Sequence, residues 1–379
     1  MFKLFGKQSS KIAALAAAMV AANSGIVRAE VLHPFPGPNT PEAWNKGIAQ
    51  EHVGVHKKSD EFWTESWYFM VQLPADAYLF NHFTISNAGF GDFTGAVETT
   101  IVYPDGRVVF EKEKIDSSDM SYDNAKGEVK FGDMGLMHAK PGSFHISVKG
   151  EKIQYEFMVR NQAPGYRPGD GVTYFGKDKK TYYDLTILTP NGTATGKATY
   201  EGKTVAINGM VYGDHSHQDH PPHKLAQRLF SMRDFDAASN SATDLLVFVP
   251  PADYGKDARV ANLIVAQGNK INFAARNLLT TEKEFTADPQ LPSYKTPKVI
   301  ELTNVPGEPA VKGTITITKQ LQRQDAIADA NFVERTAIKM FGLKPILYRF
   351  EAKYDIQYEG GSSTGTALVE YLLMRKQDE

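Results

Sequence analysis

Cysteine is absent from all 379 residues of the chain. Disulfides therefore add nothing to its stability, even in an oxidising compartment, and lipid attachment through a cysteine behind a leader is excluded. Charge of one sign is not in excess either, because 42 basic residues stand against 44 acidic ones. A chain without a basic excess is a poor partner for phosphate backbones, so nucleic acid is not expected as a partner. The length favours two domains over one.

Long apolar runs are also missing beyond the N-terminus, so no transmembrane span is expected. The N-terminus itself has the pattern of a secretory signal, in which three lysines precede an apolar run at residues 12–20. Val27 and Ala29 place small residues before a cleavage site near Ala29. We therefore expect residues 1–29 to be a signal peptide and the mature protein to be periplasmic or secreted, with 38 basic against 44 acidic side chains.

The remainder of the chain has the pattern of an all-β protein. Short runs rich in Val, Ile, Thr, Tyr and Phe are separated by turn sequences such as Pro104-Asp105-Gly106. Many of these runs alternate polar with apolar residues, as 143–149 does, which is typical of strands with one buried face. Such strands must close into a barrel or stack as a sandwich to cover their apolar faces, and their spacing is compatible with both.

The strand pattern is interrupted once by a segment rich in His and Pro, which divides the chain into two β units in tandem. We expect an N-terminal β unit over residues 30–212, a junction over 213–223 and a C-terminal β unit over 224–379. One helix is expected in the second unit, where Asp325 can cap an amphipathic stretch that ends at Gly342.

Two local patterns suggest chemistry. Glu65 lies between Trp63 and Trp67 on one face of a predicted strand, and a carboxylate in such surroundings must be paired, protonated or solvated. Four of the ten histidines fall within residues 215–223, and part of this segment resembles the zinc-binding H-x-H-x-D-H signature of metallo-β-lactamases. That family needs further histidines, and none follows His223. No cofactor is therefore expected, and a zinc hydrolase is the least favoured alternative, with its ligands in His215, His217, Asp219 and His220.

A more specific resemblance starts at the end of the first unit. Gly209-x-x-Tyr212-x-Asp214-His215 resembles the G-x-x-W-x-D-H motif of the AttH and carotenoid 1,2-hydratase (CrtC) family. Glu65-Ser66-Trp67-Tyr68 resembles the E-W-W-Y segment of that family, and residues 365–371 resemble its closing G-x-x-Y-V-E segment. The similarity covers about residues 60–375.

The resemblance implies two lipocalin-like antiparallel β-barrels of the calycin type, with the Asp-His segment at their junction. It also implies a protein that binds a hydrophobic small molecule, such as a lipid, fatty acid or isoprenoid, and that is linked to lipid metabolism; peripheral contact with a membrane is compatible with such a cargo. The alternative is a hydratase or isomerase of an unsaturated terpenoid or lipid, with Asp214 as the acid and His215 as its orienting or relaying partner. The expected ligand-binding residues are Glu65, Trp67, Tyr68, Tyr212, Arg233, Glu370 and Tyr371.

A purely structural part for Asp214 and His215, fixing the two barrels, stays open beside these functions. If the site is shared, Arg233, Glu65 and Glu370 should all lie within about 12 Å of the junction around Asp214, because the polar groups of a site converge on one cavity.

Overall fold

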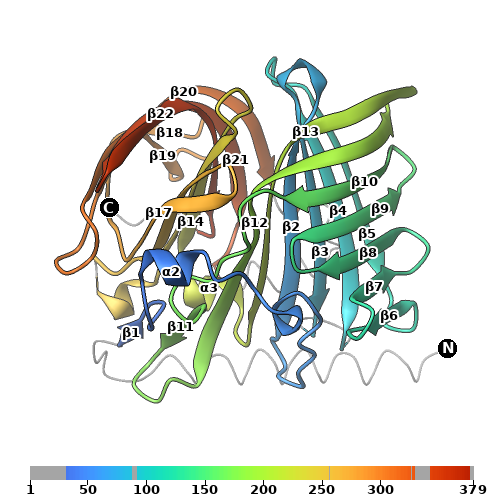
Figure 1. Ribbon diagram of the computed structural model, residues 1–379, viewed down its shortest axis with the longest axis horizontal. Coiled ribbons are helices and arrows are strands. Elements are labelled where there is room, and N and C mark those ends of the chain that lie inside the picture. The colour runs from blue at the N-terminus through green and yellow to red at the C-terminus, as the bar shows by residue number, and fades with distance from the viewer. Residues whose placement is uncertain (1–30, 88–91, 256, 326, 329–341, 376–379) are drawn as a thin grey trace.

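The computed structural model of the protein describes residues 31–87, 92–255, 257–325, 327–328 and 342–375. These residues form two curled antiparallel sheets, which make a barrel and a half-barrel (Figure 1). The all-β fold with two tandem lipocalin-like units that the sequence predicts is confirmed.

The N-terminal sheet has 13 strands. Its main path runs in the order β5-β4-β3-β2-β13-β12-β10-β9-β8-β7-β6, and β1 and β11 extend it beside β12. The strands are β1 (Leu32–His33), β2 (Thr64–Gln72), β3 (Tyr78–Ser86), β4 (Thr94–Val102), β5 (Val108–Ile115), β6 (Met120–Asp123), β7 (Glu128–Phe131), β8 (Gly135–Lys140), β9 (Ser143–Lys149), β10 (Ile153–Asn161), β11 (Val172–Phe175), β12 (Thr181–Tyr200) and β13 (Lys203–Gln218).

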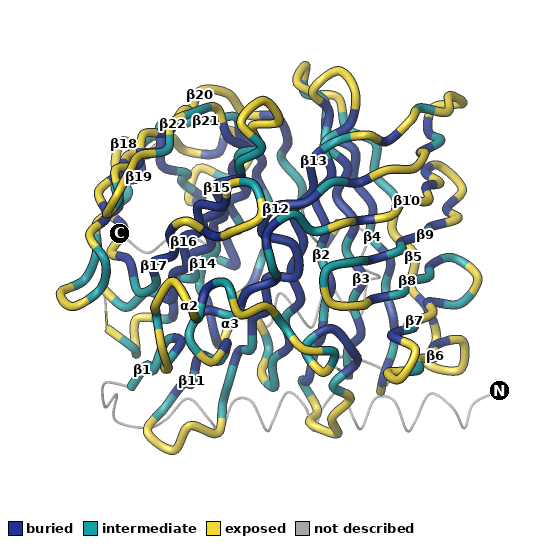
Figure 2. The backbone as a smooth tube through the Cα atoms, in the orientation of Figure 1, coloured by how far each residue is buried: buried dark blue, intermediate teal, exposed yellow. Residues whose placement is uncertain are grey.

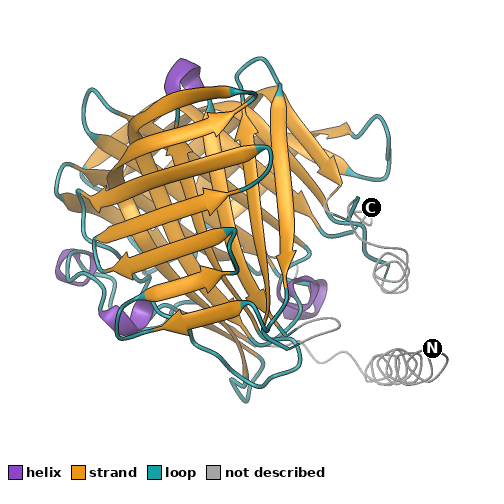
Figure 3. Cartoon of the chain, turned by 90° about the vertical axis from the view of Figure 1, so that its right-hand side faces the viewer, coloured by secondary structure: helices purple, strands orange, loops and turns teal. Residues whose placement is uncertain are grey.

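The C-terminal sheet has nine strands in the order β17-β16-β15-β14-β22-β21-β20-β19-β18. Each strand pairs antiparallel with its neighbours. In Figure 3 the strands of the N-terminal sheet face the viewer. The strands are β14 (Arg228–Asp236), β15 (Ser241–Val249), β16 (Val260–Gln267), β17 (Lys270–Arg276), β18 (Leu279–Ala287), β19 (Lys295–Thr303), β20 (Val311–Asp325), β21 (Ile346–Tyr358) and β22 (Gly361–Leu373).

Alternation of apolar and polar residues sets which face of each strand is buried. Strand β10 shows this best, because Ile153, Tyr155, Phe157 and Val159 are buried while the residues between them are exposed. The inward side chains of the N-terminal sheet form one core rich in aromatic rings, including the stacked pair Phe83 and Phe131 at 4.6 Å.

Strand β13 is longer than the sequence suggests. It continues to Gln218, so the junction expected over residues 213–223 is corrected to a short connection that ends in α3 (Pro222–Leu225). Gly213 allows this continuation, since a Cβ atom there would lie 2.6 Å from the ring of Phe69 on the neighbouring strand.

The segment before β2 connects both units. Helix α2 (Pro41–Trp44) packs on β17 of the C-terminal sheet, where the Trp44 ring meets Phe273 at 6.0 Å and the Asn45 side chain exchanges two hydrogen bonds with the backbone of Ile271. The chain then crosses to the N-terminal sheet before β2 begins. Part of the range 30–212 that the sequence assigns to the first unit thus also contacts the second sheet.

The two sheets meet along β2, β12 and β13 on one side and β14, β15 and β22 on the other. Figure 2 shows the buried stretches gathered where these strands stand beside each other. A small apolar cluster seals one part of the contact, with Met70, Phe80 and Val102 from the first sheet against Leu321 and Leu368 from the second. Polar side chains fill the part next to it, as described below.

Two predictions lie outside the described residues. The signal peptide over residues 1–29 is one, and the helix after Asp325 is the other, apart from Ile327 and Ala328. Asp325 itself is the last residue of β20. Among the residues that the structure describes, no helix has the length and apolar character needed to cross a bilayer.

Candidate functional site

The residues of the Asp-His motif point to opposite faces of β13. Side chains alternate along a strand, so Tyr212, Asp214 and Ser216 face the second sheet while His215 and His217 face the interior of the first. Strand β2 pairs with β13, and its side chains alternate between the same two faces, with Tyr68 pointing toward the second sheet. The structure therefore has two polar clusters back to back, one on each face of β2 and β13.

The first group, which we call the junction cluster, consists of Tyr212, Asp214, Arg233, Asp244 and Glu370. Arg233 is its centre and is buried. Its Nη2 lies 3.6 Å from Oδ2 of Asp214, its Nε 3.2 Å from Oδ1 of Asp244 and its Nη1 3.2 Å from Oε2 of Glu370. The guanidinium also lies over the Tyr212 ring, 4.1 Å from its centroid. One cation thus joins a strand of the first sheet to three strands of the second.

Glu370 is the best satisfied carboxylate of the junction cluster. The hydroxyl of Tyr68 donates to Oε2 at 2.7 Å, and Nε of Arg349 donates to Oε1 at 2.8 Å. Burial alone would raise the pKa of Glu370, but the charges of Arg349 and Arg233 outweigh it and lower that pKa. Glu370 therefore stays ionised and pairs with both arginines.

Asp214 and Asp244 are in the opposite situation. Burial raises the pKa of Asp214 to about 6 and that of Asp244 to about 7, although the charge of Arg233 opposes both shifts. Neither oxygen of Asp244 accepts a hydrogen bond from the residues that the structure describes. Two guanidinium groups, those of Arg233 and Arg349, thus face three carboxyl groups. The raised pKa values of Asp214 and Asp244 favour a proton on one of these two carboxyl groups near neutral pH.

Replacing Asp244 by Asn tests whether Asp244 carries this proton. The pKa of Asp244 is raised on folding, so the folded chain binds more protons than the unfolded chain between about pH 4 and pH 7, and stability falls as the pH rises through that window. Asp244→Asn lacks this loss. In denaturant unfolding at pH 8, we expect the free energy of unfolding of the variant to equal or exceed that of the wild type. At pH 5 the difference between the two should shift in favour of the wild type.

The matched control for that experiment is Asp355→Asn, an exposed carboxyl on β21. It should follow the wild-type pH dependence. A slope between pH 5 and pH 8 that is the same in Asp244→Asn and in the wild type would show that Asp244 does not carry the proton.

An apolar pocket opens beside the junction cluster and is lined by both sheets. Phe175 and Tyr183 from the first sheet face Leu229, Phe248 and Leu372 from the second, around an empty volume of about 420 Å³ that includes the opening to solvent. Leu229 and Arg233 are four residues apart on one face of β14, which separates pocket and cluster by about 13 Å. Burial and, after it, the charge of Asp214 raise the pKa of Tyr183, whose ring lines the pocket.

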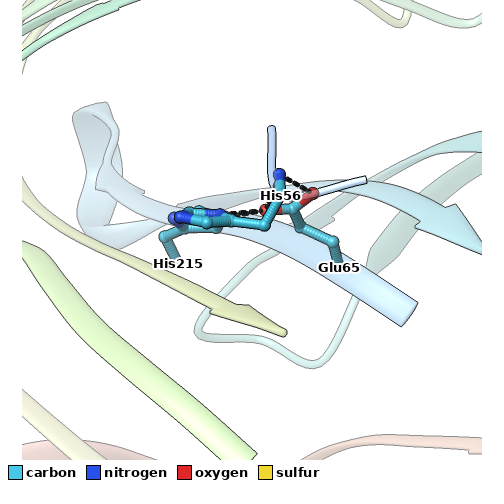
Figure 4. Close-up of side chains that lie close together, drawn as sticks. All are labelled: His56, Glu65 and His215. Atoms are coloured by element: carbon cyan, nitrogen blue, oxygen red, sulfur yellow. Dashed lines mark hydrogen bonds and ion pairs between the residues drawn. The ribbon is translucent and has the colours of Figure 1, made fainter. Parts of the chain in front are cut away.

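The second group, which we call the histidine cluster, consists of His56, Glu65 and His215 (Figure 4). Glu65 is fully buried, and its Oε1 lies 2.8 Å from Nδ1 of His56 and 2.8 Å from Nε2 of His215. The backbone N–H of His56 also donates to both carboxylate oxygens, at 3.1 and 3.0 Å. The Trp67 ring stacks on His215 at 4.6 Å. The carboxylate that the sequence placed between two Trp residues is thus paired.

The hydrogen bonds around Glu65 decide its ionisation. Burial alone would raise its pKa, but the bonds from His215 and His56 lower it to about 2. Burial alone would likewise lower the pKa of His56, but the hydrogen bond and the charge of Glu65 raise it. His217, stacked on His56 at 4.4 Å, is different, because burial lowers its pKa to about 3 and keeps it neutral.

The predicted site residues divide among three places. Tyr68, Tyr212, Asp214, Arg233 and Glu370 meet at the junction cluster, as the sequence led us to expect for Arg233 and Glu370. Glu65 and Trp67 lie on the other face, and Tyr371 faces the interior of the second sheet, where its ring stacks with Phe230 at 6.1 Å. Glu65 therefore lies on the opposite face of the sheet from Arg233 and Glu370, and one site shared by all three stays a prediction.

A proton relay from Asp214 to His215 would have to cross β13, because the two side chains have their partners on opposite faces of the sheet. The nearest partners of His215 are Glu65 and the carbonyl of His52, both on the inner side of the sheet. Asp214 is bound to Arg233 on the outer side.

The zinc-type string of residues 215–220 does not converge either. Asp219 accepts from the backbone N–H of Tyr182 at 3.0 Å, and His220 lies at the surface. The side chains that do converge with His215 are His56 and Glu65.

Sequence reasoning missed His56, Asp244 and Arg349. Asp244 is the one charged residue of strand β15, directly before the apolar run 245–249, which is a usable signal for a buried functional group. His56 lies in an irregular segment and Arg349 in a strand with several charged residues, so neither stands out.

Comparison with known proteins agrees with the fold. The Svf1 family model matches residues 55–372. A protein assigned as AttH from Nitrosomonas europaea is similar in structure, with a TM-score of 0.57, 12% identity and coverage of 89% of this chain and 98% of that one. Kievitone hydratase from Nectria haematococca is also similar, with a TM-score of 0.57, 11% identity and coverage of 90% of this chain and 98% of that one.

A complex of CghA with the compound Sch210972 is similar to the same extent, with a TM-score of 0.57, 11% identity and coverage of 93% and 99%. No curated protein matches the sequence. Identities this low show a likeness of fold alone. The AttH-like fold that the sequence resembles is confirmed, and the resemblance to carotenoid hydratases in particular stays a prediction.

Proposed function

Because the chain belongs to the Svf1 family and shares its fold with proteins that include a hydratase and one solved with a small molecule, we propose that it binds a hydrophobic small molecule between its two sheets. The observation that carries this proposal is the apolar pocket that both sheets line. Pockets of this kind, apolar with a few polar groups at one side, are typical of small-molecule sites.

The lining of the pocket supports a specific orientation of the ligand. We expect its apolar part to lie between Phe175 and Tyr183 on one side and Leu229 and Phe248 on the other, which line the pocket. The junction cluster about 13 Å away supplies charged and hydrogen-bonding groups for a polar end. A lipid, a fatty acid or an oxygenated isoprenoid has both parts. The sequence-based expectation of a secreted or periplasmic protein is compatible with a carrier for such a cargo.

Filling the pocket should abolish binding. In Leu229→Trp the larger side chain enters the space between the sheets, so affinity for a fluorescent fatty-acid probe should fall at least about tenfold, which corresponds to 1.4 kcal/mol. Leu279→Trp, an exposed position on edge strand β18, adds the same volume outside the pocket and should bind like the wild type. Equal affinities for the two variants would place the binding site elsewhere.

The natural ligand can be sought by mass spectrometry of an organic extract from protein purified out of its own host. A lipid or isoprenoid present in the wild-type extract and depleted in the Leu229→Trp extract would support the carrier. An extract that is the same for both variants would contradict binding in this pocket.

A second function, hydration or isomerisation of an unsaturated lipid or terpenoid, is favoured by Asp244. Its carboxyl group is buried, accepts no hydrogen bond from the described residues and has a pKa raised to about 7 by burial. A protonated carboxyl can give its proton to one carbon of an alkene, and water can then capture the cation and return a proton to the carboxylate.

Asp244→Asn separates the two functions, because the amide keeps the shape of the side chain and loses the proton. Under the carrier function, the bound compound should be the same in extracts of the variant and the wild type. Under the hydratase function, the wild type should carry a hydrated or isomerised product and the variant its unsaturated precursor. An unchanged compound in both extracts would end the hydratase hypothesis.

A further inference from the structure

Three potential metal ligands converge in the histidine cluster. Nδ1 of His56, Oε1 of Glu65 and Nε2 of His215 all lie within 4.8 Å of one another, and Oε1 is 2.8 Å from each nitrogen (Figure 4). Zinc holds nitrogen and oxygen ligands at about 2.0–2.2 Å, so two ligands of one tetrahedral ion lie about 3.3 Å apart. Opening the two contacts to Oε1 by about half an ångström, with the two histidine nitrogens at a similar separation from each other, would admit the ion. We propose that these three side chains form a binding site for a divalent transition-metal ion of the zinc class.

Two of the three ligands are held by the sheet. Glu65 on β2 pairs with His217 on β13, which makes Glu65 and His215 diagonal neighbours on the same face. The Nδ1–H of His215 donates to the carbonyl of His52 at 2.8 Å, so Nε2 is the nitrogen turned toward Glu65. Metal-binding histidines usually donate their other ring N–H in this way. Trp67 stacked on the ring fixes its plane.

The third ligand lies on the solvent side and leaves an approach for the ion. The side chain of His56 is 28% exposed, whereas those of Glu65 and His215 are buried. Its ring stacks on His217, and its backbone N–H bonds to the Glu65 carboxylate, so its position is fixed although its edge is open. Three protein ligands leave a fourth position for water or another donor on that side.

The ligand set selects the class of ion. Each imidazole places one ring nitrogen 2.8 Å from Oε1 of Glu65, so the set offers two nitrogen ligands and one oxygen ligand. Two imidazoles and one carboxylate suit zinc and its neighbours in the first transition series. Magnesium and calcium require mostly oxygen ligands and are disfavoured here.

We expect the bound ion to link the segment before β2 to the sheet. His52 and His56 belong to that segment, while Glu65 and His215 belong to β2 and β13. An ion that binds the folded arrangement alone raises the stability of the fold by mass action. This inference is independent of the proposed ligand pocket, because the histidine cluster lies on the opposite face of β13.

Calorimetric titration of the mature full-length protein with Zn²⁺, after treatment with a chelator, tests the proposal. We expect one equivalent to bind, and His56→Gln to weaken binding by more than the 10–100-fold typical of losing an outer partner. His138→Gln is the matched control, since His138 forms a surface pair with Glu128 at 3.6 Å. It should bind zinc like the wild type, and Mg²⁺ should give no binding heat.

A measurement on the wild type alone guards against a variant that fails to fold. Carbethoxylation of histidines, mapped by mass spectrometry with and without Zn²⁺, should show His56 protected by the metal and His138 unaffected. The proposal is overturned if the wild type takes up no zinc at about 100 µM, if His56→Gln folds and binds as tightly as the wild type, or if zinc protects His138 and not His56. In each case the histidine cluster is a structural hydrogen-bond network that binds no metal.

Discussion

Replacing Glu65 by Gln should lower the free energy of unfolding by about 3–5 kcal/mol, the usual cost of breaking a buried ion pair from one side. The carboxylate is fully buried and receives hydrogen bonds from the rings of His56 and His215 and from the backbone N–H of His56. A Gln amide keeps the shape but offers a single acceptor oxygen. It also turns an N–H₂ group toward one of the donors and leaves the histidines without a counter-charge.

Denaturant unfolding at pH 7 measures this loss, with Glu156→Gln as the control. Glu156 also pairs with a histidine, His145 at 3.0 Å, but at the exposed surface, where such pairs contribute little. The control should unfold at the wild-type midpoint. Coincident midpoints for Glu65→Gln and Glu156→Gln would show that the buried bonds around Glu65 are not stabilising.

The pH dependence of the Glu65→Gln defect has a definite sign. The pKa of Glu65 falls from its ordinary value near 4.5 to about 2 on folding, so its stabilising effect is complete above pH 4.5 and is lost as the pH falls toward 2. The difference between wild type and variant should therefore shrink on acidification through that window. A difference that stays constant from pH 5 to pH 2 would assign the defect to packing and not to charge.

The fold could be predicted from the sequence because its signals are local. Alternation such as that of residues 153–159 shows which face of a strand is buried, and turn sequences show where strands end. Closure of each sheet depends on which strands become neighbours. That information is not local, and it came from the resemblance of the motifs around Glu65 and Asp214 to a known family.

The site was predicted in part for the same reason. Adjacent residues on a strand point to opposite faces, so Asp214 and His215 could have been separated from sequence alone once β13 was seen to continue past residue 212. The partners of these two residues could not have been predicted from the sequence. Asp244 meets Arg233 and His56 meets Glu65 only through the pairing of strands and the path of an irregular segment. Long-range contacts of this kind leave no spacing pattern in the chain.

Replacing Arg233 by Met should be as damaging as the loss of Glu65, with an expected cost of about 3–5 kcal/mol at pH 8. The guanidinium lies between Asp214, Asp244 and Glu370, and Met fills a similar volume without charge. Three buried carboxyl groups would then face Arg349 alone. Arg107→Met is the control in denaturant unfolding, because Arg107 pairs with Asp105 at an exposed turn and its loss should leave the midpoint unchanged.

The defect in Arg233→Met should also become smaller on acidification, but between pH 8 and pH 5, which is above the window in which the Glu65→Gln defect changes. Burial already raises the pKa of Asp244 to about 7 while Arg233 opposes the shift, so removing Arg233 raises that pKa further. At pH 5 the carboxyl groups of the variant can take up protons, and the cost of the missing cation should be smaller than at pH 8. If the loss is the same at both values, Arg233 stabilises the junction through its contacts with the Tyr212 and Tyr68 rings and not through its charge.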